Sequence, residues 1–225
     1  MKKMWCIPKE QDADFVAKME DVLDIYARPY DKNCPVICID EKPYQLIDEA
    51  REPLPMKEGT PTRYDNEYIR MGTSSIFVMT EPLKGWHHAH ARERRTALDF
   101  AHEIDWLLTK SSYKSAPKVI AIMDNLNTHN IASLYKAFPA PYARELTKRL
   151  EIHYTPKHGS WLNIAEVTIS ILTKQCIDRR IKSLDLLNNE IAAWEADYNA
   201  TCNNINWQFT TDDARVKLRR LYPVF

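Results

Sequence analysis

Residues 118–124 read Lys-Val-Ile-Ala-Ile-Met-Asp, and this stretch indicates the fold class. A continuous apolar run that ends in a carboxylate is typical of a central strand buried on both faces. A second run of this kind, Val36-Ile37-Cys38-Ile39, also ends in an aspartate, Asp40. Because ligands usually bind at the carboxyl ends of strands in α/β folds, Asp40 and Asp124 are the first candidate site residues.

A third carboxylate, Glu166, follows a loop that reads Pro-Lys-His-Gly-Ser-Trp-Leu-Asn over residues 156–163. Glu166 opens an apolar-periodic stretch, which predicts a helix over residues 163–176. Carboxylates at strand ends and near a helix start can converge on one point. Three converging carboxylates are suited to divalent cations, and two cations about 3.5–4 Å apart are the usual arrangement for in-line phosphoryl transfer. The sequence therefore predicts a metal site formed by Asp40, Asp124 and Glu166.

Each of these carboxylates also has a simpler interpretation. Asp124 can cap the helix that follows it, and Glu166 can complete a capping box with Asn163 as the N-cap. Glu41 is a rival for Asp40, but neighbouring residues of a strand face opposite ways, so only one of the two can point at the site. Asp48 is a weaker rival.

Basic and polar residues near the carboxylates are candidates for contact with DNA. The loop before Glu166 carries positive charge and a hydroxyl, and helix N-termini attract phosphate. His129 is close enough in sequence to Asp124 to contact a phosphate or the attacking water. A basic stretch after the Glu166 helix can line a DNA groove, although a solvated helix face is an equal alternative. The candidate DNA-binding residues are Lys157, His158, Ser160, Asn163, His129, Arg179 and Arg180.

The rest of the chain predicts a mixed α/β plan with a central sheet and flanking helices. Helices are expected over residues 10–27, 93–108 and 133–150, the last interrupted around Pro139 and Pro141. Ser183 and Thr211 are expected to cap two further helices. Short strands are expected over 36–40, 44–47, 68–70, 75–80, 86–91 and 151–155. The three histidines of residues 86–90, Trp-His-His-Ala-His, are expected to lie on a strand face near DNA or on a surface strand, and not to form a zinc site.

Bulk composition bounds the class of protein. A chain of 225 residues with 44% hydrophobic residues suits one large domain, or one domain with appendages. The net charge is zero, which removes bulk electrostatic attraction as an argument for nucleic-acid binding, although local basic stripes remain. Five scattered cysteines without a C-x-x-C pair fit a reduced, cytoplasmic setting. No membrane-length apolar run or signal-peptide pattern is present in the sequence.

In combination, these motifs resemble a known family. Asp124-Asn125-x-x-x-His129 is followed by Pro156-Lys157-His158-Gly159-Ser160-Trp161-Leu162-Asn163-x-x-Glu166, and the strand that ends in Asp40 continues with Glu41-Lys42. The tail, Trp207-Gln208-Phe209-Thr210-Thr211, fits the same group. The order and spacing resemble the catalytic core of the DDE transposases of the IS630 group, in the IS630/Tc1/mariner superfamily. The resemblance extends over residues 5–223.

The resemblance implies a ribonuclease H-like fold with a mixed five-stranded central sheet. It implies two divalent cations, Mg²⁺ or Mn²⁺, held by Asp40, Asp124 and Glu166. The implied activity is metal-dependent cleavage and strand transfer at transposon ends, with transposon-end and target DNA as partners, a homodimer as the assembly and no membrane association. The expected organisation is a helical lead-in over 1–32, a catalytic core over 33–182 and a helical extension over 183–225.

Two other functions stay open at this point. One is a different ribonuclease H-like nuclease that cuts without strand transfer. The other is an inactive DNA-binding or dimerisation remnant, because members of the family carry helix-turn-helix domains before the core and this chain begins close to the core.

Overall fold

A mixed sheet lies at the centre of the protein in a computed structural model that describes residues 7–224. Its strand order is β3-β2-β1-β4-β5. The strands are β1 (Val36–Glu49), β2 (Tyr68–Glu81), β3 (Trp86–Arg92), β4 (Val119–Met123) and β5 (Leu150–Tyr154). β1, β2 and β3 pair antiparallel, while β4 and β5 run parallel to β1. The expected mixed five-stranded sheet is therefore confirmed, and residues 1–6 of the expected lead-in lie outside the described residues.

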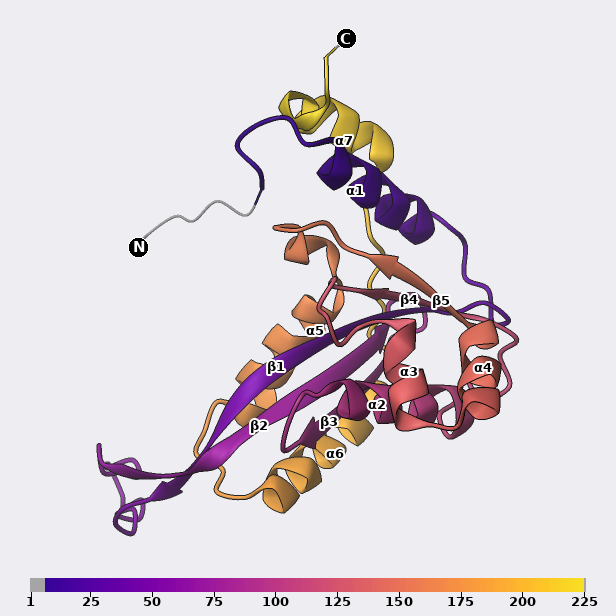
Figure 1. The fold of residues 1–225 in the computed structure, drawn as a ribbon. Coiled ribbons are helices and arrows are strands. Elements are labelled where there is room, and N and C mark those ends of the chain that lie inside the picture. Colours follow the sequence, from indigo (N-terminus) through magenta and orange to yellow (C-terminus); the bar gives the residue numbers. More distant parts are fainter. Residues whose placement is uncertain (1–6, 225) are drawn as a thin grey trace.

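Helices cover both faces of this sheet (Figure 1). They are α1 (Ala13–Tyr26), α2 (Ala97–Thr109), α3 (Ile131–Ala137), α4 (Ala140–Arg149), α5 (Ala165–Leu172), α6 (Leu184–Ala200) and α7 (Thr211–Lys217). Helices α2, α3 and α4 pack on one face. Helices α1, α5 and α6 pack on the other, and α7 lies against α1. Within residues 7–224, none of the helices is long and apolar enough to cross a membrane.

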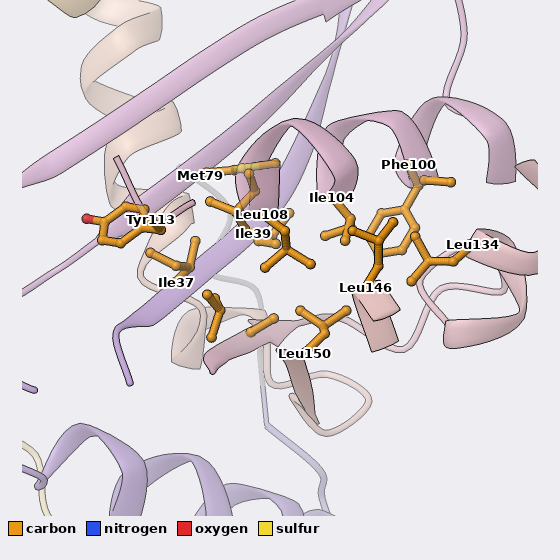
Figure 2. Close-up of a cluster of buried hydrophobic side chains, with 14 of the residues drawn as sticks. Ile37, Ile39, Met79, Phe100, Ile104, Leu108, Tyr113, Leu134, Leu146 and Leu150 are labelled. Atoms are coloured by element: carbon orange, nitrogen blue, oxygen red, sulfur yellow. The ribbon is translucent and has the colours of Figure 1, made fainter. Parts of the chain in front are cut away.

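Alternation along β1 divides the core into two layers. Ile37 and Ile39 are fully buried against α2, and Figure 2 shows them beside Ile104 and Leu108. Cys38 lies between them and faces the α1 side. Each aliphatic side chain buried in this way contributes about 1.5–3 kcal/mol to stability. Because Asp40 continues this alternation, it belongs to the face of Cys38.

The sequence predicted four short strands where the structure has two long ones. Residues 36–40 and 44–47 belong to one strand, β1, which passes through Pro43. Beyond Cys38, β1 pairs with β2 alone, so Pro43 interrupts no hydrogen bond to β4. Residues 68–70 and 75–80 likewise belong to β2, where the register shifts opposite Leu46 and Ile47 and Gly72 has a φ of 112°. A β-bulge near Gly72 therefore lets β2 continue through residues that were expected to separate two strands.

Helix starts differ from expectation by a few residues. Ser183 caps α6 as predicted. Thr210, and not Thr211, caps α7 through a capping box with Asp213. Similarly, α2 begins after Thr96, which forms a capping box with Asp99, and not at Glu93. The helix expected over 163–176 begins at Ala165 and ends in a wider, π-type turn over Thr173–Ile177.

The far ends of β1 and β2 form an arm that projects from the body of the protein (Figure 1). Residues 50–67 make up its tip, with isolated bridges between Leu54 and Arg63 and between Lys57 and Thr60. Arg180 holds the base of the arm: its guanidinium pairs with Glu49 and donates to a backbone carbonyl at Asp65, 2.7 Å away. The arm is therefore tied to the segment that follows α5.

The three histidines of β3 connect the edge of the sheet to three helices. His87 is fully buried and lies 3.2 Å from the hydroxyl of Thr168 in α5. His88 pairs with Glu195 of α6 at 2.9 Å, and His90 pairs with Glu103 of α2 at 2.8 Å. These side chains hold helices, so the expectation of a surface strand is corrected.

Candidate metal centre

Two aspartates lie side by side because of the parallel pairing of β1 and β4. Cys38 is the register partner of Ile122. Asp40 and Asp124 each lie two residues beyond that pair, so both side chains leave the sheet on the face of Cys38 and Ile122. The pairing thus places the two predicted aspartates next to each other at the end of β4.

Asp40 lies in a partly buried position with bonds to both carboxylate oxygens. Oδ1 accepts the backbone N–H of Glu41 at 2.8 Å, and Oδ2 accepts the side-chain amide of Asn163 at 3.3 Å. Burial is the main cause that raises the pKa of Asp40 to about 7; the Glu41 N–H opposes the rise, and the negative charges of Glu166 and Asp124 contribute to it. All three predicted carboxylates therefore act electrostatically on one region.

Glu166 lies in the first turn of α5, with its side chain exposed. The capping-box interpretation of this residue is wrong, because the N-cap is Ile164 and no side chain caps the helix. Asn163 is buried and donates instead to the backbone carbonyl of Ile39 at 2.8 Å. It connects the start of α5 to β1, so it fixes Glu166 relative to Asp40.

Asp124 also does not cap a helix, since the N-cap of α3 is Asn130. Its Oδ1 contacts Nδ1 of His129 at 2.6 Å, and its side chain is 47% exposed. The hydrogen bond with His129 lowers the pKa of Asp124 below its ordinary value, although partial burial opposes this. Asp124 is therefore held as a carboxylate.

His129 is fully buried, and its other ring nitrogen, Nε2, contacts the carboxylate of Glu41. Burial alone would lower the pKa of His129, but hydrogen bonds with Asp124 and Glu41 outweigh it and raise that pKa to about 9. Both ring nitrogens thus point at carboxylates inside the protein, away from any surface where DNA could lie. Glu41, the rival for Asp40, is engaged in the same contact with its side chain 3% exposed.

Lys157, His158 and Ser160 of the predicted loop line a cavity of about 420 Å³ beside Asp124. His158 adopts a φ of 65°, which produces the sharp turn between β5 and the start of α5. Lys18 of α1 lines the same cavity. The loop therefore surrounds the exposed side of Asp124 with positive charge and hydroxyl groups.

Arg179 and Arg180 lie away from this cavity. The guanidinium of Arg179 pairs with Glu190 of α6, and its side chain is 52% exposed. Arg180 is held at the base of the arm by Glu49. Both cations already have carboxylate partners, so neither belongs to the carboxylate region, which is the region around Asp40, Asp124 and Glu166.

The residues present fit divalent cations in charge and chemistry. Oxygen ligands from carboxylates are those that Mg²⁺ and Mn²⁺ prefer. Burial is the main cause of the raised pKa of Asp40, and the negative charges of Glu166 and Asp124 add to it. Among residues 7–224, however, no three metal-ligating side chains already lie close enough together to hold one ion. Both oxygens of Asp40 and Oδ1 of Asp124 take part in hydrogen bonds, and the side chain of Glu166 is exposed to solvent.

Three features of this site were not predicted from the sequence. The contact between Glu41 and His129 joins residues far apart in the chain, and only the position of Glu41 directly after Asp40 was a local signal. Lys18 lies on α1, where its helical spacing indicates nothing about the site. Tyr154 was also missed: its hydroxyl donates to the backbone carbonyl of His129 at 2.6 Å.

Comparison with known proteins extends this description. The family model described as DDE superfamily endonuclease matches residues 35–188. The fold resembles the Mos1 mariner paired end complex with Mn at a TM-score of 0.56 and 14% identity, covering 90% of this chain and 62% of that chain. For the paired end complex with Mg, the TM-score is 0.57 at 14% identity, and the match covers 100% of this chain and 67% of that chain. For the catalytic domain of Mos1 mariner transposase, the TM-score is 0.50 at 12% identity, and the match covers 88% of this chain and 96% of that chain.

These likenesses confirm the ribonuclease H-like fold that the sequence resemblance implied. This chain spans 62% of the length of the transposase chain in the Mn complex. No curated protein sequence matches it. Because the family model extends over more than half of the chain and includes Asp40, Asp124 and Glu166, the protein belongs to the DDE superfamily of endonucleases.

Proposed function

We propose that this chain is the catalytic part of a transposase of the IS630 group, which cuts DNA at transposon ends and joins the freed 3′ ends to target DNA. The observation that carries the proposal is geometric: the parallel pairing of β1 and β4 places Asp40 beside Asp124, and Asn163 connects Asp40 to the start of α5, where Glu166 lies. Three carboxylates placed in one region of a chain that belongs to a family of endonucleases support metal-dependent phosphoryl transfer.

In this proposal, Asp40, Asp124 and Glu166 hold two divalent cations, Mg²⁺ or Mn²⁺. When bound, such cations lower the pKa of an attacking water or 3′-hydroxyl and stabilise the leaving oxygen. The solved Mos1 complexes with Mn and with Mg support this choice of ions. The protein supplies the orientation: Asn163 holds Asp40, and His129 holds Asp124.

The cavity beside Asp124 is the proposed place of contact with DNA. Lys157, His158 and Ser160 lie on its wall, where a phosphate can accept hydrogen bonds from them. The similar Mos1 structures include a paired end complex and a strand transfer complex. By analogy, this protein is proposed to bring two transposon ends together as a homodimer.

A joining assay separates transposition from simple hydrolysis. The full chain is incubated in Mn²⁺ with a labelled duplex that carries the terminal repeat of the surrounding transposon, together with a supercoiled target plasmid. A transposase yields labelled plasmid, whereas another ribonuclease H-like nuclease only nicks the DNA. An inactive remnant that binds DNA shifts the duplex in a gel and yields neither product, which would refute the proposed activity.

Substitution of Asp124 by asparagine is the matched control for this assay, because it keeps the size of the side chain and removes its charge. D124N is expected to abolish nicking and joining, with at least about a thousandfold loss of rate, since a carboxylate ligand of the cations is gone. D48N changes a partly exposed aspartate on the arm side of β1 and is expected to keep wild-type activity. Equal activity of D124N and D48N would rule out the assigned metal centre.

A further inference from the structure

Glu41 and His129 form a buried pair directly behind the carboxylate region. Glu41 follows Asp40 on β1, and its side chain is directed to the opposite face of the sheet, where it is 3% exposed. His129 comes from the loop between β4 and α3 and is fully buried. A charged group buried this deeply requires a partner, and each of these residues supplies it to the other.

The imidazole of His129 bridges two carboxylates. Nδ1 lies 2.6 Å from Oδ1 of Asp124, and Nε2 contacts Oε1 of Glu41. Carboxylate oxygens accept hydrogen bonds, so the ring donates from both nitrogens. Asp124 is thereby connected through His129 to β1, the strand that carries Asp40.

The ring of His129 has little freedom to move. Its centroid lies 4.9 Å from that of Phe100 in α2. Its backbone is held at both ends, because the N–H donates to the carbonyl of Leu126 at 2.8 Å and the carbonyl accepts the hydroxyl of Tyr154 at 2.6 Å. A histidine whose ring is held by packing and two hydrogen bonds, and whose backbone is held by two more, can define the direction of the carboxylate it contacts.

We propose that Glu41 and His129 act as positioning residues for Asp124. They fix Oδ1 of Asp124 and leave its second oxygen directed at the exposed side of the site. This inference rests on the proposed function, because it assigns the pair to the orientation of a metal ligand. Residues that orient metal ligands through hydrogen bonds typically change metal affinity or activity by 10–100-fold when they are replaced.

The protein contains a matched control for this arrangement. His153 on β5 also bridges two carboxylates, with Asp21 at 2.6 Å and Glu151 at 3.0 Å. Its side chain is 16% exposed, and neither of its partners belongs to the candidate metal centre. A histidine substitution at position 153 therefore removes the same kind of bridge without affecting Asp124.

The test is Mn²⁺ binding to the full chain. Binding is measured by calorimetry and by electron paramagnetic resonance up to millimolar Mn²⁺, with and without a short DNA duplex. H129Q is expected to weaken Mn²⁺ binding by about 10–100-fold. E41Q keeps the side-chain size and is expected to weaken binding in the same direction by a smaller factor. H153Q is expected to bind Mn²⁺ within about twofold of wild type. Circular dichroism and urea unfolding establish that each variant is folded.

Three outcomes overturn the inference in distinguishable ways. If folded H129Q and E41Q bind Mn²⁺ as wild type does, the pair is only a structural contact, and the metal centre itself stands. If H153Q loses affinity as much as H129Q, the effect is general destabilisation. If the folded wild-type protein binds no Mn²⁺ under either condition, the proposed function fails together with the inference. Should H129Q not fold, E41Q alone decides between the first outcome and the proposal.

Discussion

Adjacent residues in β1 have opposite surroundings. Asp40 faces Asn163 on the side of α5, while the carboxylate of Glu41 contacts His129 on the side of α2. Strand alternation alone separates them, since neighbouring side chains leave a sheet on opposite faces. Alternation implies that only one of the two carboxylates can be a ligand, and the resemblance to the family favours Asp40. Neither predicts what the other carboxylate contacts, because that partner comes from a distant loop.

Asn163 is the residue whose loss should most directly release Asp40. Its side chain is 1% exposed and donates to the carbonyl of Ile39 at 2.8 Å. N163A leaves that buried carbonyl without this partner, so the free energy of unfolding is expected to fall by about 1–3 kcal/mol. Urea unfolding measures the change. N125A, at an exposed position, is expected to stay within about 0.5 kcal/mol of wild type, and equal effects of both variants would contradict this role.

Glu81 gives the protein a predictable dependence of stability on pH. It is 1% exposed, and burial raises its pKa from 4.5 to about 7. A carboxyl whose pKa is higher in the folded state loses stabilisation as the pH rises from about 4.5 to about 7. E81Q cannot ionise, and its amide oxygen can still accept the Tyr113 hydroxyl.

E81Q is therefore expected to be more stable than wild type by roughly 3 kcal/mol at about pH 8, with the difference falling to roughly 1 kcal/mol at about pH 5. Urea unfolding at both pH values checks this. E58Q, at an exposed position on the arm, should show no such difference. A stability gain of E81Q that is the same at both pH values would show that ionisation is not its cause.

At the scale of elements, Arg180 ties the arm to the segment that follows α5. Arg180 pairs with Glu49 and donates to the backbone carbonyls of Asp65 and Glu67 at 2.7 and 3.1 Å. R180A removes hydrogen bonds from a charged donor, each worth about 1.5–3 kcal/mol. Amide hydrogen exchange in residues 62–71 is therefore expected to accelerate at least about tenfold, while β4 exchanges as in wild type.

Lys182 provides the control for the arm, because it lies near the same strand with its side chain 60% exposed and its ammonium 3.9 Å from Asp48. K182A is expected to leave exchange in the arm unchanged. Faster exchange in β4 of R180A would indicate that the substitution disturbs the whole sheet and not the arm alone.

The order and type of the elements could be predicted from the sequence, and their lengths could not. Apolar runs such as residues 119–123 identify buried strands because no polar residue interrupts them. The expected strands 36–40 and 44–47 left out Pro43, and the expected strands 68–70 and 75–80 left out Gly72, although tertiary pairing extends β1 and β2 through both residues. Whether a proline disrupts a strand depends on which neighbour is present at that residue, and a single sequence does not contain this information.

The candidate site could also be predicted only in part. The three carboxylates could be selected because each follows or precedes a recognisable element, and because their order and spacing resemble the motifs of the family. The orientation of Asn163 and His129 was not predictable, since both were expected to face DNA and both are buried. A polar residue beside a site motif can hold another side chain as readily as it contacts substrate, and burial alone decides between these roles.

At the scale of the whole molecule, the two ends of the described chain pack together. Leu221 is fully buried against the α1 cluster, and its carbonyl accepts the backbone N–H of Asp12 at 3.0 Å. L221A is expected to lower the free energy of unfolding by about 2–5 kcal/mol. V216A, on α7 with Val216 77% exposed, should change it by no more than about 0.5 kcal/mol. Chemical unfolding of both variants tests whether the C-terminal segment is part of the cooperative unit.

The pairing of β1 with β4 has a consequence for synthesis of the chain. β1 is made early, but its parallel neighbour emerges only after β2, β3 and α2 have been translated. Such non-local contacts form late, and Glu166 leaves the ribosome later still. A nascent or truncated polypeptide that ends before α5 therefore lacks one of the three acids, and in the proposed enzyme it would leave the DNA of the cell that makes it uncut.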